Sequence, residues 1–156
     1  MNEDTIKPKE KELFSKYPNL FGYTNPEKIQ RRMVGTIIDA FGIECGYGWF
    51  DIISELCDKI NEYEKSKNTG SLLESFEKKY TPVKFTQIKQ KFGGLTIYFD
   101  GGDKQIRNFV EEAERSSYTI CEVCGKPGKP TKKGWIRVVC EEHEKNEKWF
   151  NWKYNK

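Results

Sequence analysis

Four residues near the C-terminal end constrain this chain more than any other feature: a cysteine pair, and then a cysteine and a histidine, each separated by two residues. They are Cys121, Cys124, Cys140 and His143. Thiolate sulfur and imidazole nitrogen are the ligands that zinc prefers in a tetrahedral site, and a two-residue gap lets each pair bind one ion from a single turn. The spacing therefore predicts one bound zinc ion. His143 is the only histidine of the sequence.

The residues around these ligands predict how the chain surrounds the metal. Gly125 follows the second cysteine, where a tight turn often needs a positive φ. Alternation over residues 134–139 predicts a strand, and Cys140 and His143 open a predicted helix that continues to Glu147. A turn, a hairpin and a helix start form a treble-clef-like zinc unit. Four protein ligands leave no position for water, so we expect the zinc to be structural.

Hydrophobic spacing predicts helices in the first half of the chain. Residues 1–12 are polar and charged, which predicts a solvated start, and residues 10–17 can form a short helix before Pro18. A second helix is predicted from Pro26 to Phe41, ended by Gly42. A third begins near residue 50 and frays over 65–70, and 71–80 forms a further short helix or an ordered loop. The apolar face of the third helix comprises Phe50, Ile53, Leu56, Cys57 and Ile60.

Between residues 82 and 99 the pattern changes to the alternation of strands. We expect two strands joined near residues 91–94, a turn over 100–103, and an amphipathic helix over 103–117. The predicted fold class is α+β: helices with a small antiparallel sheet and a C-terminal treble-clef-like zinc unit. Residues 1–117 form the helical and β-hairpin core region, and residues 118–156 form the zinc unit. The helix at 103–117 runs into that unit without a linker, so we expect the unit to pack on the core.

Composition excludes some classes of protein. The net charge is +3, from 27 basic and 24 acidic residues, so nucleic-acid binding would need a local basic patch. The start of the chain lacks an apolar leader, and no apolar stretch approaches the roughly 20 residues of a membrane-spanning helix. We therefore expect a cytoplasmic protein without membrane contact. Its five cysteines are then metal ligands or buried thiols rather than disulfides.

Two glycine-containing loops are candidate ligand contacts. Residues 46–49 precede a predicted helix, so their backbone N–H groups could hold an anion, with Tyr47 and Trp49 beside it. A packed loop in which Trp49 anchors the next helix is the favoured alternative. The turn at 91–94, with Lys91, is also open to two interpretations. A hairpin turn is the favoured one, and a ligand contact is the alternative.

Basic residues interleaved with aromatic ones mark a second kind of candidate surface. On the predicted zinc hairpin they are Lys126, Lys129, Lys132, Lys133 and Arg137 around Trp135, and a similar stretch occupies residues 148–154. Such a pattern suits phosphate contacts and base stacking. The alternative is that the aromatic residues pack locally while the lysines are solvated.

Three motifs together resemble a family of small uncharacterised proteins of bacteria, phages and prophages. They are CGYGWF at 45–50, KFGGL at 91–95, and CEVCG at 121–125 followed by Gly134-Trp135, Arg137, Cys140 and His143. The resemblance spans roughly residues 40–145. Tyr47 departs from it, because an acidic residue is expected between the two glycines of the first motif. The resemblance implies a mobile-element setting and carries over no catalytic residue.

Three functional hypotheses follow. The first is a zinc-stabilised, non-enzymatic binding protein that engages a host protein or a nucleic acid, as a counter-defence factor for example. The second is a protein that sequesters a small anionic, nucleotide-like ligand in a pocket lined by residues 46–50 and 91–95. The third is a treble-clef nuclease-like enzyme, which a chain with one histidine disfavours.

Overall fold

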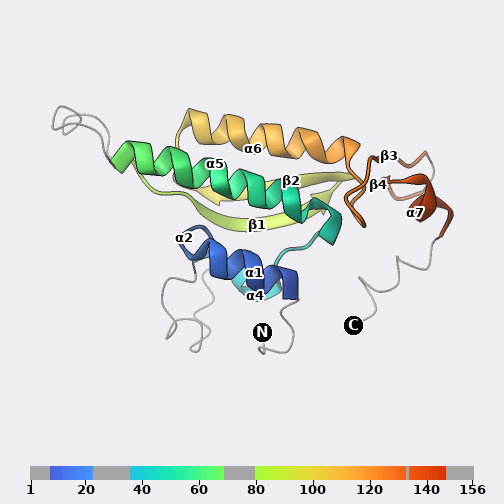
Figure 1. The fold of residues 1–156 in the computed structure, drawn as a ribbon, viewed down its shortest axis with the longest axis horizontal. Helices are drawn as coiled ribbons and strands as arrows, with labels where there is room; N and C mark the ends of the chain where they lie inside the picture. Colours follow the sequence, from blue (N-terminus) through green and yellow to red (C-terminus); the bar gives the residue numbers. More distant parts are fainter. Residues whose placement is uncertain (1–7, 23–35, 69–79, 133, 147–156) are drawn as a thin grey trace.

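The computed structural model describes residues 8–22, 36–68, 80–132 and 134–146. These residues form an α+β fold, as predicted, with six α-helices and two two-stranded antiparallel sheets. The longest helix, α5 (Phe50–Asn68), runs beside α6 (Lys104–Ser116) (Figure 1). α6 packs on the hairpin of β1 (Lys84–Lys91) and β2 (Gly94–Asp100). The short helices α1 (Pro8–Lys16), α2 (Pro18–Phe21) and α4 (Ile37–Phe41) complete this part, and α2 and α4 contact β1.

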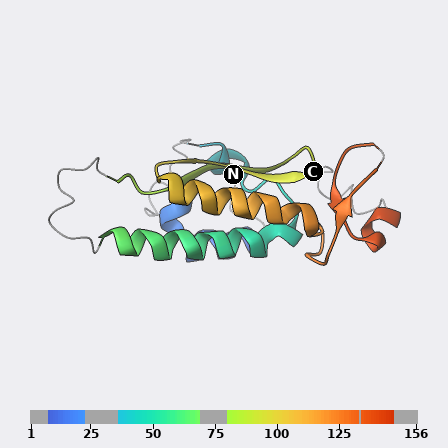
Figure 2. The same cartoon turned by 90° about the horizontal axis from the view of Figure 1, so that it is seen from above.

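The remaining short elements belong to the C-terminal segment. η4 (Ser117–Thr119) follows α6 directly and leads to β3 (Lys129–Pro130), β4 (Val138–Val139) and α7 (Glu141–Lys145). Figure 2 shows this segment at one end of the pair α5 and α6. We refer to residues 118–146 as the metal unit.

The core lies between the helices and the hairpin, and the predicted apolar face of α5 is part of it. All five residues of that face are at most 5% exposed. α6 confirms the predicted amphipathic helix: Ile106, Val110 and Ala113 are buried and Phe109 is partly buried. No helix in the described part of the chain is long and apolar enough to cross a membrane.

The hairpin joins its strands through a two-residue turn. Lys91 pairs with Gly94, and the turn residues Phe92 and Gly93 have φ values of 50° and 84°. Positive φ at both central positions is the geometry of a type I′ turn, which matches the twist of antiparallel strands. The predicted strand–turn–strand arrangement is therefore confirmed.

The outer edge of β2 is bonded to side chains of the neighbouring helical segment. The N–H of Leu95 donates to the Ser117 hydroxyl at 2.9 Å, and the N–H of Ile97 donates to the Glu114 carboxylate at 2.8 Å. Burial raises the pKa of Glu114. An unpaired strand edge would otherwise present these groups to other chains, so the two bonds close the edge.

The continuous helix predicted from Pro26 to Phe41 is wrong at its C-terminal part. Thr36 is extended, with φ −140° and ψ 166°, and begins a new helix, α4. The Thr36 hydroxyl accepts from the Asp39 N–H while the Asp39 carboxylate accepts from the Thr36 N–H, a capping box that starts a helix at this point. Phe41 is 66% exposed, so the predicted apolar stripe does not all face the core. Residues 23–35 lie outside the described residues.

Two further expectations change. Residues 8–12 are helical, and Glu10 is buried because its carboxylate accepts from the N–H of Ile43 at 2.9 Å. α5 includes residues 65–68 of the segment predicted to fray, since Lys67 lies 3.6 Å from the Asp103 carboxylate and over the Tyr63 ring, and residues 69–70 lie outside the described part of the chain. The predictions for residues 1–7, 71–79 and 147–156, including the basic aromatic stretch at 148–154, fall outside the described residues.

The strand predicted over 134–139 is shorter than expected. Only Val138 and Val139 are in β4, because Gly134 has a φ of 73° and, beyond one backbone bond from the Thr131 N–H to the Arg137 carbonyl, side-chain bonds replace the strand ladder. The Thr131 hydroxyl donates to the Trp135 carbonyl at 3.2 Å and accepts from the Arg137 N–H at 3.1 Å.

Candidate metal centre

The four predicted ligands meet at one point of the metal unit. One donor atom from each of Cys121, Cys124, Cys140 and His143 lies within 4.8 Å of all the others. The Sγ atoms of Cys124 and Cys140 are 3.8 Å apart, and Cys121 Sγ lies 3.6 Å from His143 Nδ1. Cys140 Sγ lies 3.2 Å from the same nitrogen.

These separations can be compared with those of a tetrahedral ion. Bonds of about 2.3 Å to sulfur and about 2.0 Å to nitrogen place neighbouring sulfurs about 3.8 Å apart and sulfur about 3.6 Å from nitrogen. Two of the three observed distances match these values, and the third is somewhat shorter. The cluster can therefore coordinate a metal ion.

Local backbone structure positions each ligand pair. After Cys121 the chain turns back, with the Gly125 N–H donating to the Cys121 carbonyl at 2.9 Å, and Gly125 has the predicted positive φ, 78°. Cys140 is the N-cap residue of α7, so the first helical turn brings His143 beside it. Partial burial acts to raise the pKa of Cys140, but the backbone N–H of His143 and neighbouring donors lower it to about 7. The lowered pKa favours the metal-binding thiolate form at Cys140, whereas burial raises the pKa of Cys124 to about 11.

The glycine loop at 46–49 packs directly on this metal-binding turn. The Gly46 N–H donates to the Glu122 carboxylate at 3.1 Å, and the Gly48 N–H donates to the Glu122 backbone carbonyl at 2.8 Å. Glu122 is 3% exposed, so its own carboxylate lies where the sequence allowed an external anion. The favoured interpretation, a packed loop, is the one that these contacts support.

Glu122 is a residue that sequence reasoning did not identify. Its position between the first two predicted ligands is only a weak indication that its side chain has a structural role. Its hydrogen-bond partner Gly46 is 76 positions away in the chain. Pairing over that distance is a property of the fold and leaves no local pattern in the sequence.

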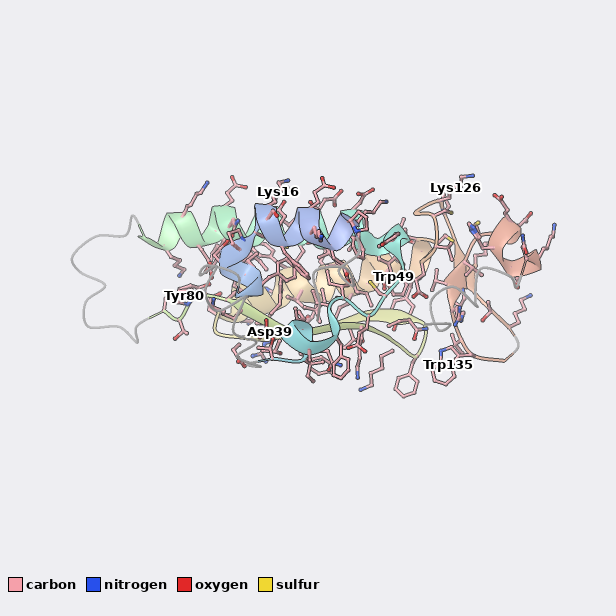
Figure 3. The ribbon with its side chains drawn as sticks, turned by 90° about the horizontal axis from the view of Figure 1, so that it is seen from below. Lys16, Asp39, Trp49, Tyr80, Lys126 and Trp135 are labelled. Atoms are coloured by element: carbon pink, nitrogen blue, oxygen red, sulfur yellow. The ribbon has the colours of Figure 1, made fainter. Side chains whose placement is uncertain are left out.

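Two of the predicted partner-binding residues are inside the protein. Trp49 is 0% exposed, and its indole N–H donates to the Ile120 carbonyl at 2.8 Å (Figure 3). Arg137 is 7% exposed. The prediction that these two side chains bind a partner is therefore corrected, because both are buried in the fold. Tyr47 is half-buried, with its ring 5.0 Å from that of Phe50, and burial raises the pKa of Tyr47.

Trp135, by contrast, is at the surface, where the metal unit meets the β1–β2 hairpin (Figure 3). The contact is close: a β-carbon at Gly93 would lie 2.6 Å from Cγ2 of Ile136. The Gln90 side chain also donates to the Ile136 carbonyl at 3.0 Å. Phe92, Trp135 and Ile136 are 76%, 69% and 49% exposed. Large exposed apolar side chains are therefore present on both sides of this junction.

Lysines accompany these apolar residues. The Lys91 ammonium lies 3.4 Å from the Tyr98 hydroxyl and 5.8 Å from the centre of the Phe92 ring, and Lys89 lies 5.7 Å from the Tyr98 ring. Lys132 is exposed in the loop of Trp135, and Lys133 lies outside the described residues. We call the following set the tip surface: Lys89, Lys91, Phe92, Tyr98, Lys132, Trp135 and Ile136.

A small cavity of about 100 Å³ lies between α5 and α6. Its lining includes Ile52, Leu56 and Phe109, and the ion pair of Lys59 and Glu112, 3.1 Å apart, stands beside it. This is not the predicted ligand pocket, which required the loops at 46–50 and 91–95. Glycines of those loops pack on the metal unit instead.

No protein-family model, curated protein or solved structure matches the chain. The metal centre and the tip surface are therefore the two features of the molecule that bear on its function.

Proposed function

We propose that this chain is a zinc-stabilised, non-enzymatic binding protein that engages a host protein or a nucleic acid through the tip surface. The observation that carries the proposal is the exposure of Phe92 and Trp135 on two hairpins that contact each other. Adjoining exposed apolar side chains mark interaction sites, and aromatic residues are enriched at interfaces.

Zinc is the metal that this donor set favours. Three thiolates and one imidazole in a tetrahedral arrangement are typical of structural zinc sites. The turn at 121–125 carries Cys121 and Cys124, and the start of α7 carries Cys140 and His143, with the β3–β4 hairpin between them. This order supports a treble-clef unit. A closed set of four ligands gives the zinc a role in folding, because metal binding then contributes directly to the stability of the surrounding chain.

The chemistry of the remaining thiols supports a binding role over an enzymatic one. Cys45 and Cys57 are both 0% exposed, and burial raises the pKa of Cys57. A nucleophilic cysteine needs a low pKa and access to substrate. The only histidine of the chain is one of the four proposed ligands.

The mobile-element setting is the further part of the proposal, and its support is the resemblance in sequence. Glycines of the first two motifs contact the segment of the third: Gly46 and Gly48 adjoin the turn at 121–125, and Gly93 adjoins Ile136. Shared motifs of this kind reflect a shared packing arrangement. We propose a phage or prophage protein, acting in the cytoplasm as a counter-defence factor, where thiols stay reduced and can bind zinc.

Affinity capture tests this function. The zinc-loaded wild-type protein and a Phe92→Asn/Trp135→Ala variant are used as baits in a lysate of the bacterial host, and bound proteins and nucleic acids are identified by mass spectrometry and sequencing. We expect a partner that the wild type retains and the variant loses. A Lys104→Gln variant, changed at the opposite end of the hairpin, is the control and should retain it. Partners recovered equally by all three baits would contradict the proposal.

A further inference from the structure

Phe92 occupies a position that the fold itself does not favour for a large side chain. It is the first central residue of the type I′ turn, with a φ of 50°, where asparagine, aspartate and glycine are preferred. At 76% exposure its ring gains little from burial. Backbone strain retained without a packing benefit is typical of functional positions.

Trp135 is exposed on a backbone that is held in place. Its carbonyl accepts from the Thr131 hydroxyl at 3.2 Å, and the Thr131 N–H donates to the Arg137 carbonyl at 2.7 Å. The indole is 69% exposed. A large flat ring on a fixed loop loses little conformational freedom when a partner binds to it.

The two hairpins that carry the rings are in contact, and we call this junction the platform. Gly93, the residue after Phe92, contacts Ile136, the residue after Trp135. The Gln90 side chain adds a hydrogen bond to the Ile136 carbonyl at 3.0 Å. The spacing between the two hairpins is therefore fixed by direct contact.

Positive charge accompanies the rings. Lys91 lies beside both Phe92 and Tyr98, and Lys89 lies over Tyr98. Three acidic residues of the metal unit, Glu141, Glu142 and Glu144, are on α7, at the end of the unit away from the hairpin (Figure 1), and a fourth, Glu122, is buried. Lys89 has an acidic neighbour, because Glu44 pairs with it in a parallel β-bridge, so Lys91 and Lys132 carry the positive charge of the tip surface.

Rings alternating with lysines match the chemistry of a single-stranded nucleic acid, whose bases offer flat faces and whose backbone offers phosphates. A duplex hides the base faces, and lysine is depleted in protein–protein interfaces. We infer that the tip surface binds single-stranded nucleic acid, with bases stacked on Phe92 and Trp135 and phosphates beside Lys89, Lys91 and Lys132. This inference rests on the proposed function and names its partner.

Fluorescence anisotropy with labelled oligonucleotides tests the inference. The zinc-loaded full chain is titrated into single-stranded dT and U oligomers of about twelve nucleotides and into a duplex of the same length. We expect the single strands to bind more tightly than the duplex, with an affinity that falls steeply as salt is added. Trp135→Ala should weaken binding by about 5- to 150-fold, the range for loss of one stacking ring.

Variants separate binding from folding. Phe92→Asn places a preferred turn residue at the same position, so it should keep or raise the melting temperature while weakening binding. Lys91→Gln should weaken binding and reduce the slope of affinity against salt by about one. Lys104→Gln removes the same charge far from the platform and should leave both quantities unchanged.

Three results would overturn the inference: no binding to either single strand at low salt, equal affinity for the duplex, or wild-type affinity in Phe92→Asn and Trp135→Ala. The result that contradicts the proposed function is a different one: partners that all three baits capture equally. If capture from lysate returns a protein that depends on the tip surface while the oligonucleotides do not bind, the surface is a protein interface and only the inference is lost.

Discussion

A β-carbon at Gly48 would lie 2.1 Å from the carbonyl oxygen of Cys121. No side chain fits at that distance, so the glycine loop and the first metal ligand can approach only because residue 48 is glycine. The contact joins the start of α5 to the metal site, and it ties together two sequence motifs that are more than 70 residues apart.

Gly48→Ala should therefore damage the metal site from outside it. We expect a loss of at least about 2 kcal/mol in the free energy of unfolding, as for overpacked cores, and faster metal loss to a chelator. Chemical denaturation and a colorimetric zinc-release assay measure the two effects. Gly22→Ala is the control: Gly22 has a φ of 77° but no atom within 4 Å of the added carbon, so it should reduce stability without changing metal release. Unchanged metal release in Gly48→Ala would contradict the coupling.

Removal of the metal should unfold the metal unit and expose Trp49. The Trp49 indole donates to Ile120, next to the first ligand, so loss of the metal removes its partner. Chelation or Cys124→Ser should shift tryptophan fluorescence to longer wavelength and reduce helical circular dichroism slightly. Metal analysis should give about one equivalent of zinc for the wild type and less than half for Cys124→Ser. A zinc content well below one equivalent in the wild type, or a full equivalent in Cys124→Ser, would contradict the proposed site.

Asp103 should contribute to stability as the N-cap of α6. Its carboxylate accepts from the N–H groups of Gln105 and Ile106 and from the Tyr63 hydroxyl at 2.6 Å. Asp103→Ala should cost about 1–2 kcal/mol in the free energy of unfolding at pH 7. Urea denaturation measures the loss, which should be absent from an exposed site such as Lys104→Ala.

The same residue has a pH dependence of known sign. Burial acts to raise the pKa of Asp103, but the Tyr63 hydroxyl and the two N–H groups outweigh it and lower the pKa. The unfolded state then binds more protons than the folded state near pH 4, so the contribution is present above that pH and is lost as the pH falls. Asp103→Asn keeps a hydrogen-bond acceptor without the charge. The difference in the free energy of unfolding between the wild type and this variant should therefore shrink on acidification. A difference that is constant between pH 7 and pH 3.5 would contradict this prediction.

Cys45 and Cys57 should resist thiol reagents in the folded, zinc-loaded protein. Both side chains are 0% exposed, and burial raises the pKa of Cys57, so little thiolate is present. Mass spectrometry after iodoacetamide treatment should show neither residue modified until denaturant is added. Rapid alkylation of either in the native protein would show that the core opens, and would revive a role for a reactive thiol.

Local patterns predicted those parts of the fold that depend on neighbouring residues. The buried face of α5, the strand–turn–strand at 84–100 and the metal ligands all follow from spacing within one segment. Thr36 was missed because the apolar stripe continues across it, although its capping box with Asp39 ends any longer helix there.

The candidate surface could be predicted only in part, for a physical reason. Trp135 and Lys91 were identified from composition, but their neighbours come from different hairpins, and Phe92 was seen only as a turn residue. Trp49 and Arg137 have the same residue chemistry as exposed binding groups, yet the fold buries them. Burial of an amphipathic side chain depends on distant partners such as Ile120, which no local pattern contains.

The bonds from the glycine loop to Glu122 have a consequence for protein engineering. Many small zinc modules can be cut from one protein and grafted into another, because they carry all of their own contacts. Here Gly46, Gly48 and Trp49 supply one wall of the metal-binding turn from a separate part of the chain. A transplant of residues 118–146 alone would lack that wall, and a chain ending at residue 117 would leave three N–H donors without acceptors. The metal unit can thus be transferred to another protein only together with the loop at 46–49.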